Sequence, residues 1–339
     1  MQKSSKNNIK GSCDPLPQVS LRTVRIMTQG EAGATAKPKR LAWQGDEGFC
    51  QTHSKMSECV SIIFIGDIVG QSGRQIVSDY LNNSKDLSEL KDKEAAGNPN
   101  FIVANVENAS HGFGLTLKNH NELVSMGIHA FTSGNHIWDK KEIFSFIDTS
   151  DRLIRPLNYP DDVPGVGSKI FSLKDPACGI INIGVINLLG RIFMNPIESP
   201  WSALEKEVRR MKEITPIILV DFHAEATAEK ISFGYYADKL GVSALVGTHT
   251  HVQTSDEKIL KKGCAYITDV GFCGASEGVI GMDCESSFKR LSTGLPERFD
   301  VAKKGKTELN AVKILINKQT GRAQSIKRIK YLKDYSEVN

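Results

Sequence analysis

The amino-acid sequence predicts an α/β domain with a largely parallel sheet, and three observations support that fold class. Short apolar runs rich in β-branched residues recur from residue 60 onward, and helical patterns lie between many of them. The composition, 40% hydrophobic and 24% charged, is that of a globular protein with a sizeable core. Fibrous, collagen-like and wholly disordered chains are thereby excluded.

The first predicted strand covers residues 60–65 (VSIIFI), a continuous apolar run that the pair Gly66-Asp67 closes. Such a run is typical of a parallel strand that is buried on both faces. Seven later runs of the same kind are predicted as strands: 101–106, 130–132, 180–188, 217–222, 244–246, 265–268 and 312–316. Because helical patterns alternate with these strands, we expect them to form a largely parallel sheet.

Two helices are predicted from their start signals. Ser199 with Pro200 has the pattern of a cap followed by a first-turn proline. The apolar residues after this pair fall on one face at helical spacing: Trp201, Leu204, Val208 and Met211. Asp139 with Glu142 three residues later resembles a capping box, which predicts a helix across residues 139–147.

Charge is distributed unevenly along the chain. Residues 1–56 carry a formal charge of +5, whereas residues 57–339 carry −1. The near-neutral body, which we expect to be the folded domain, argues against an extended nucleic-acid surface or an anionic membrane partner. The first 56 residues are predicted to be a disordered extension or the result of a start codon placed too early, since Met56 stands just before the first strand; their composition also loosely resembles an organelle-targeting leader. Residues 83–100 are polar and predict a surface insertion.

Cysteine use and hydropathy predict a cytoplasmic protein. The seven cysteines are scattered, odd in number and without a CxxC pair, a pattern typical of reduced thiols. The longest nearly apolar run, residues 179–190, is interrupted by Asn182 and Asn187 and is shorter than the about 20 residues that a membrane-spanning helix needs. We therefore expect no membrane partner, and the sequence leaves homo-oligomerisation open.

Polar side chains follow the predicted strands at the points where the strands end. In chain order they are Asp67, Glu107, Asn108, Asn135, His136, His223, His249 and His251. Ligand sites in open α/β sheets lie beyond the carboxyl ends of the strands, so we expect these side chains to converge. Apart from His136, these residues offer two carboxylates, two amide oxygens and three imidazoles, which suit two borderline metal ions such as Mn, Fe or Zn.

Each of these residues also has an ordinary structural interpretation. Asp67 can cap a turn, the 107–108 pair can be turn chemistry, and a single His223 is usually a hydrogen-bonded, semi-buried histidine. The GTHTH segment favours metal ligation over packing, because His249 and His251 stand two apart directly after an apolar strand. Their joint occurrence at successive strand ends favours a metal centre.

The ordered motifs resemble the YmdB family of bacterial metallophosphoesterases. They are GDIVG (66–70), NVENASHGFGLT (105–116), TSGNHIWD (132–139), RPLNYP (155–160), VDFHAEAT (220–227), GTHTHVQTSDE (247–257) and ITDVGFCG (267–274). The resemblance runs from about residue 61 to residue 329. It implies a four-layer αββα sandwich of the metallophosphoesterase type. It also implies a dinuclear phosphodiesterase that acts on cyclic nucleotides, notably the 2′,3′-cyclic forms.

The resemblance also implies roles for individual residues. Asp67, Glu107, Asn108 and His251 would hold one metal, and Glu107, Asn135, His223 and His249 would hold the second, with Glu107 bridging. The two ions would be divalent or mixed-valence, with Fe or Mn favoured over Zn. Much of the wider superfamily has a histidine where this chain has Val69. Val106 and His111 also depart from the small residues that we expect in the loop after the second strand, which bears on substrate fit; for His111 a surface position is the preferred interpretation.

The mechanistic hypothesis is that a hydroxide held between the two metals attacks phosphorus. His136 as an imidazolium would then donate a proton to the departing ribose oxygen. Asp139, Glu225 and Asp269 are predicted to orient ligands from behind, although a capping role is the preferred interpretation of Asp139. Which ester bond breaks, and which base is preferred, cannot be predicted from these patterns.

Two alternatives remain at this point. The chain can be a regulatory or scaffold protein with a structural metal site, although amide, carboxylate and imidazole ligands beside a free His136 differ from a closed, cysteine-rich structural site. It can also be a phosphatase or nuclease that uses the same centre. The near-neutral body disfavours long nucleic acid, whose binding needs clustered Lys and Arg.

Overall fold

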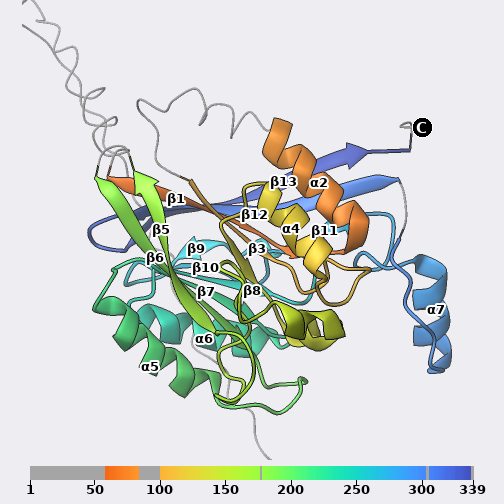
Figure 1. Cartoon of the computed structure of the whole chain (residues 1–339), viewed down its shortest axis with the longest axis horizontal. Helices are drawn as coiled ribbons and strands as arrows, with labels where there is room; N and C mark the ends of the chain where they lie inside the picture. Colours follow the sequence, from red (N-terminus) through yellow and green to blue (C-terminus); the bar gives the residue numbers. More distant parts are fainter. Residues whose placement is uncertain (1–57, 84–99, 176–177, 303–304, 337–339) are drawn as a thin grey trace, which may run out of the picture. The chain divides into compact units, whose positions relative to one another are not determined.

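The computed structural model describes residues 58–83, 100–175, 178–302 and 305–336, which form two mixed β-sheets and five α-helices (Figure 1). The first sheet contains β1 (Cys59–Ile65), β2 (Asp67–Ile68), β3 (Asn100–Asn105), β4 (Ala130–Thr132), β11 (Phe272–Ala275), β12 (Lys306–Asn317) and β13 (Ala323–Asp334). The second contains β5 (Ser168–Asp175), β6 (Gly179–Leu189), β7 (Ile218–His223), β8 (Ala244–Thr248), β9 (Lys258–Ile259) and β10 (Ala265–Ile267). The helices are α2 (Gly70–Asn83), α4 (Leu117–Ser125), α5 (Pro200–Lys212), α6 (Thr227–Leu240) and α7 (Cys284–Thr293).

Each sheet joins parallel strands to antiparallel ones. In the first sheet the order is β2-β11-β12-β1-β3-β4, with β13 also paired to β12; β1, β3 and β4 are parallel, whereas β12 is antiparallel to its three partners. In the second the order is β5-β6-β7-β8-β10-β9, with β6, β7, β8 and β10 parallel and both edge strands antiparallel. All eight predicted strands are confirmed, but the expectation of a largely parallel sheet holds only for the middle of each sheet.

Strands with continuous apolar runs are buried on both faces. In β1, Val60, Ile62 and Phe64 share a cluster with β6 and β7 of the other sheet. The alternate residues Ile63 and Ile65 pack in a different cluster with α2 and α4. On the second sheet, β7 packs in the same way against α5 and α6. Figure 1 shows α2 beside β12 and β13, and α5 beside β6 and β7.

The two predicted helices have different outcomes. Ser199 is the residue before α5 and Pro200 is in its first turn, as predicted, although the Ser199 side chain makes no capping hydrogen bond. The prediction of a capped helix from Asp139 is wrong. That segment forms two short 3-10 helices, η1 (Asn135–Trp138) and η2 (Lys141–Ser145), and Asp139 lies at the end of η1. Its carboxylate bonds to the imidazole of His136 instead of capping a helix.

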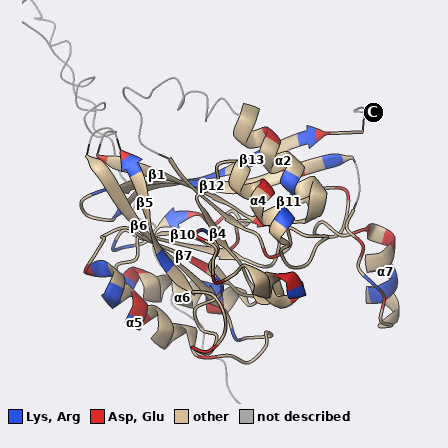
Figure 2. Cartoon of the chain, viewed as in Figure 1, with Lys and Arg blue, Asp and Glu red and all other residues tan. Residues whose placement is uncertain are grey.

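The described residues carry both positive and negative charges on their surface, in line with the near-neutral charge of residues 57–339. In Figure 2, positions of Lys or Arg and positions of Asp or Glu lie close together along α5 and along α7. The five cysteines within the described ranges are free thiols. No described helix has the length and hydropathy to cross a bilayer. The predicted extension (1–56) and most of the predicted insertion (84–99) lie outside the described residues.

Candidate active site

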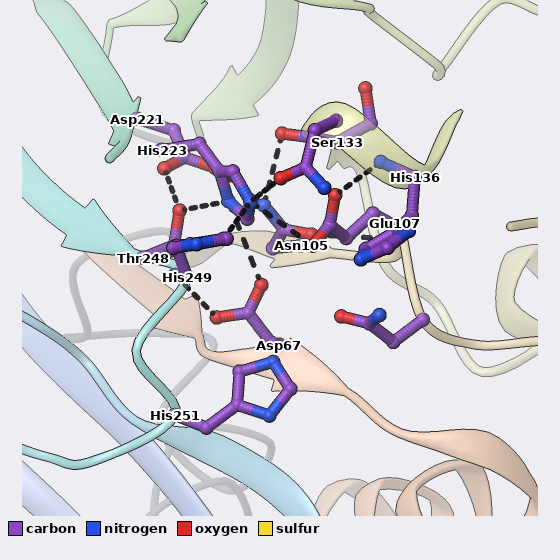
Figure 3. A network of polar contacts seen from close by, with 12 residues as sticks. Asp67, Asn105, Glu107, Ser133, His136, Asp221, His223, Thr248, His249 and His251 are labelled. Carbon is purple, nitrogen blue, oxygen red and sulfur yellow. Dashed lines mark hydrogen bonds and ion pairs between the residues drawn. The ribbon is translucent and has the colours of Figure 1, made fainter. Parts of the chain in front are cut away.

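The predicted metal ligands lie together beyond the carboxyl ends of strands from both sheets (Figure 3). His223 is the last residue of β7 in the second sheet. The others follow β1, β3 and β4 in the first sheet and β8 in the second: Asp67, Glu107, Asn108, Asn135, His249 and His251. Asp67 and His223 are fully buried, whereas His249 and His251 line a pocket. Parallel strands aim their carboxyl ends at one edge, which is why residues so distant in sequence meet here.

His223 is the centre of the closest group of donor atoms. Its Nε2 lies 3.0 Å from Glu107 Oε1, 3.0 Å from His249 Nδ1 and 3.2 Å from Asn135 Oδ1. The donor atoms of Glu107, His223 and His249 all fall within 4.8 Å of one another, a grouping that can hold a metal ion. Four nitrogen and oxygen donors therefore face one small volume.

Two buried residues behind His223 set which ring nitrogen carries the proton. Thr248 Oγ1 donates to Asp221 Oδ1 at 2.7 Å, so its oxygen accepts from His223 Nδ1, 2.9 Å away. The neutral imidazole then keeps its lone pair on Nε2, which faces the other donors. The sequence analysis assigned no role to Asp221 or Thr248. The sequence feature that could have indicated their role is the carboxylate of Asp221 within the apolar run 217–222, since a buried charge needs a partner.

A second group of donors has unused acceptor atoms. Within the described part of the chain, buried Asp67 Oδ1 and Asn108 Oδ1 accept no hydrogen bond. Asn108 Nδ2 donates to the carbonyl of Gly112 at 2.8 Å, which points its amide oxygen away from that bond. His251 Nδ1 donates to the carbonyl of Ile280 at 2.9 Å, which leaves Nε2 with the lone pair. Buried acceptors without donors are costly unless a cation satisfies them.

The electrostatics of these buried carboxylates and imidazoles favour a bound cation. Burial raises the pKa of Asp67 well above its usual value. Burial also lowers the pKa of His251. Burial and the nearby His223 lower the pKa of His249 to about 3. The imidazoles of His249 and His251 are therefore neutral donors. Burial opposes charge on His223 as well, but the carboxylate of Glu107 outweighs it and raises the pKa of His223 to about 9. Positive charge is therefore strongly stabilised between these carboxylates.

The segment after β8 holds its two histidines in an uncommon backbone conformation. His249 and His251 have φ values of 102° and 64°, in a region that costs about 1–3 kcal/mol for each non-glycine residue. Asp269 stabilises the loop by accepting from the backbone N–H of Thr250 at 3.1 Å. The buried ammonium of Lys230 binds the same Asp269 oxygen at 2.7 Å. Asp269 thus orients the histidine loop from behind, and its partner Lys230 was not predicted.

His136 lies on the pocket wall beside the donor group. Its backbone N–H donates to Glu107 Oε2 at 3.0 Å, and its Nδ1 lies 2.8 Å from Asp139 Oδ2. Phe113 packs edge-on against the imidazole, with 4.9 Å between ring centroids. The ring is therefore held by Asp139 and Phe113, with Nδ1 occupied by the carboxylate.

Asn105, the last residue of β3, is a further support that sequence reasoning missed. Its Nδ2 donates to Asp221 Oδ2 at 3.0 Å and to the carbonyl of Ser133 at 3.1 Å. Its Oδ1 accepts from the backbone N–H of Glu107 at 3.1 Å. One buried amide thus links the end of β3 to β7 and to the segment after β4, fixing the backbone that carries Glu107.

The remaining predicted residues lie at the edge of the site or outside it. Glu225 Oε2 is 3.1 Å from His249 Nε2 and is half exposed. Val69 and Val106 are fully buried, and Val69 belongs to an apolar cluster instead of pointing a polar atom at the donors. His111 is exposed, which confirms the preferred interpretation of a surface residue.

Replacing Thr248 with valine should weaken metal binding by about 10- to 100-fold, because the imidazole of His223 loses the group that fixes its tautomer. Thr248→Ser keeps the hydroxyl and is the matched control. The measurement is a Mn²⁺ titration of each purified variant, followed by metal content. Equal affinities in the valine variant and the wild type would contradict the role of the Asp221–Thr248–His223 chain.

Comparison with known proteins shows the family of the chain. The model of the YmdB-like protein family matches residues 63–329. The chain belongs to this family. A 2′,3′-cyclic-nucleotide 2′-phosphodiesterase from Bacillus subtilis is 47% identical to this YmdB-like chain over 268 residues, which cover 79% of the chain and 96% of the relative.

Two solved structures resemble this YmdB-like protein closely. A crystal structure described as a novel phosphatase from Mycoplasma pneumoniae has a TM-score of 0.71 and 35% identity, covering 81% of this chain and 94% of that one. A hypothetical protein from Thermus thermophilus has a TM-score of 0.70 and 34% identity, covering 81% of this chain and all of that one. The mixed α/β architecture is thus shared with experimentally determined members.

Proposed function

We propose that this chain hydrolyses 2′,3′-cyclic nucleotides at a centre of two metal ions. The chain is a phosphodiesterase-type hydrolase, in line with the Bacillus subtilis relative whose name states the cyclic-nucleotide activity. The observation that carries the finer proposal is the grouping of donors around His223: Glu107, Asn135 and His249 approach its Nε2 within 3.2 Å. Such mixed donors are suited to Fe, Mn or Zn.

In this proposal the donors divide into two sets that share one carboxylate. Asp67, Glu107, Asn108 and His251 would hold the first ion, and Glu107, Asn135, His223 and His249 the second. The unpaired acceptor oxygens of Asp67 and Asn108 support the first set. Bound metal ions supply positive charge, which activates a water nucleophile and stabilises charge on the phosphoryl oxygens.

The chain's own residues would supply the proton for the leaving group. His136 lines the pocket beside Asn108 and His249, within reach of an ester bound at the donors. Asp139 accepts the Nδ1–H, which fixes the ring and leaves Nε2 to hold the proton that passes to the departing ribose oxygen. Glu225 and Asp269 would orient His249 and its loop. We assign Asp139 a positioning role and His136 the role of general acid.

We also propose that residues 57–339 form one metallophosphoesterase domain with layers in the order αββα. The three apolar clusters support this order, because each sheet has one face toward the other sheet and one toward helices. The free cysteines support a cytoplasmic location. We expect the partner to be a small phosphodiester.

Full-length, Mn-loaded protein should hydrolyse 2′,3′-cyclic AMP, and Asp67→Asn should remove that activity. A phosphomonoester such as p-nitrophenyl phosphate and a single-stranded RNA, assayed in parallel, test the phosphatase and nuclease alternatives. Two bound metals without turnover of any phosphodiester would contradict the proposal and favour a regulatory protein. Faster turnover of the monoester than of cyclic nucleotides would favour a phosphatase.

A further inference from the structure

The pocket beside the proposed metal ligands has an apolar half. Its volume of about 390 Å³ lies within the range of small-molecule sites. Its polar lining residues include Glu107, Asn108, His136, His249 and His251. Its apolar lining residues include Phe113, Met282, Leu291 and Phe299. A bound phosphodiester would therefore extend its substituent toward apolar and aromatic side chains.

Two hydrogen bonds fix this apolar half relative to the proposed ligands. Asn108 Nδ2 donates to the carbonyl of Gly112, the residue before Phe113, at 2.8 Å. His251 Nδ1 donates to the carbonyl of Ile280, which also lines the pocket, at 2.9 Å. The side chains that would hold the metals thus also hold the two segments that carry the apolar wall, so the wall is fixed relative to the proposed ligands.

The aromatic rings of the wall also pack against neighbouring side chains. Phe113 and Phe299 pack against a buried cluster that includes Met282 and Val69. The guanidinium carbon of Arg290 lies 4.4 Å from the ring centroid of Phe299, which covers part of that ring with a cation. Rings held in this way offer a rigid stacking surface at little entropic cost.

Helix α7 adds a polar atom to this apolar pocket. Ser287 is the buried residue of α7, with 1% of its surface exposed, and it lines the pocket. Across the described residues its Oγ makes no hydrogen bond. Its neighbours Phe288 and Leu291 are each 74% exposed, so the helix buries a serine while it exposes apolar side chains. A buried hydroxyl without a partner is unfavourable unless a ligand satisfies it.

From this arrangement we infer a nucleobase subsite, an inference that rests on the proposed function. The base of a nucleoside 2′,3′-cyclic phosphate lies against Phe113 and Phe299, and the side chain of Ser287 turns its buried Oγ toward the base to form a hydrogen bond. Any base can stack on an aromatic ring, and a hydroxyl both donates and accepts hydrogen bonds, so adenine and guanine should bind with similar affinity. Ser287 and Phe299 are therefore specificity-determining residues for nucleosides over smaller phosphodiesters.

The test compares two substrates with the same five-membered cyclic phosphodiester, of which only one carries a base. Steady-state kinetics of full-length, Mn-loaded protein are measured with 2′,3′-cyclic AMP and with glycerol 1,2-cyclic phosphate. Stacking on aromatic side chains should give the nucleotide a KM at least about tenfold lower. Phe299→Leu and Ser287→Ala should each raise KM for the nucleotide, about tenfold and several-fold respectively, while kinetics with the glycerol ester stay unchanged.

Two controls separate binding from folding. Ser287→Ala should not lower the thermal unfolding midpoint, because it removes an unpaired hydroxyl. Ser292→Ala and Phe288→Leu change exposed residues of the same helix and should leave both substrates unaffected. If the wild type hydrolyses both esters but the Ser287 and Phe299 variants change neither KM, or both equally, the base subsite alone is overturned. If the wild type hydrolyses neither, the proposed function and this inference both fail.

Discussion

Replacing Glu107 with glutamine is expected to reduce turnover of a cyclic phosphodiester by about 10³-fold or more, with loss of bound metal. The carboxylate is buried, its Oε1 lies 3.0 Å from His223 Nε2, and its Oε2 accepts the backbone N–H of His136 at 3.0 Å. Glutamine has the same shape but no charge, and it turns an N–H₂ group toward one of these neighbours. A metal centre contributes several kcal/mol to the transition state, which corresponds to this loss of rate.

The measurement is kcat together with metal content on the same samples. Glu142→Gln makes the same chemical change at an exposed residue of η2 and should leave both quantities intact. Circular dichroism melting of both variants separates loss of metal from loss of fold. If Glu107→Gln retained two metals per chain and normal turnover, the assignment of Glu107 as the shared ligand would be wrong.

The buried strands could be predicted from sequence because their physical cause is local. A strand with helices or a second sheet on both faces is apolar at most positions, so β1, β7 and the runs like them can be recognised in a single sequence. The strands β5 and β13 carry no such run. In β13, Arg328 and Lys330 alternate with Ile329 and pair with Glu257 and Glu308, each at 2.9 Å. The antiparallel strands β5 and β13 were therefore missed.

At Asp139, where the predicted helix was wrong, two partners compete for one carboxylate, and the sequence motif does not show which of them binds it. The spacing to Glu142 satisfies a capping box, but a carboxylate can serve only one demanding partner. Here the imidazole of His136 lies 2.8 Å away and takes that place, and the segment closes into 3-10 turns. Whether such a side chain caps a helix or contacts a residue of the site depends on which strands pack nearby in the folded domain.

The predicted ligands stood out because strand ends are unusual places for so many polar residues. Their supports are hidden inside strands. Asn105 and Asp221 are 116 residues apart and meet at 3.0 Å only after β3 and β7 have been placed in separate sheets. Lys230 similarly meets Asp269 across the second sheet's connections. Pairings of this kind depend on the topology of the whole domain, which a single sequence does not display.

Replacing His136 with alanine should lower kcat by about 10²- to 10⁴-fold while the metal content stays at the wild-type level, because a general acid contributes to the leaving-group step and not to the donor sets. Asp139→Asn should lower kcat by a smaller factor, since the amide still contacts Nδ1 but no longer carries charge. A substrate with a good leaving group, bis-p-nitrophenyl phosphate, needs little proton donation and should be much less affected by both changes.

His111 provides the matched control for this experiment. It is an exposed histidine with φ of 59°, and asparagine tolerates that backbone conformation, so His111→Asn removes an imidazole near the site without strain. We expect wild-type kcat and metal content from it. If His136→Ala lost metal and turnover in equal measure, or slowed both substrates equally, then His136 would act by supporting the backbone beside Asn135, and the leaving oxygen would take its proton from water.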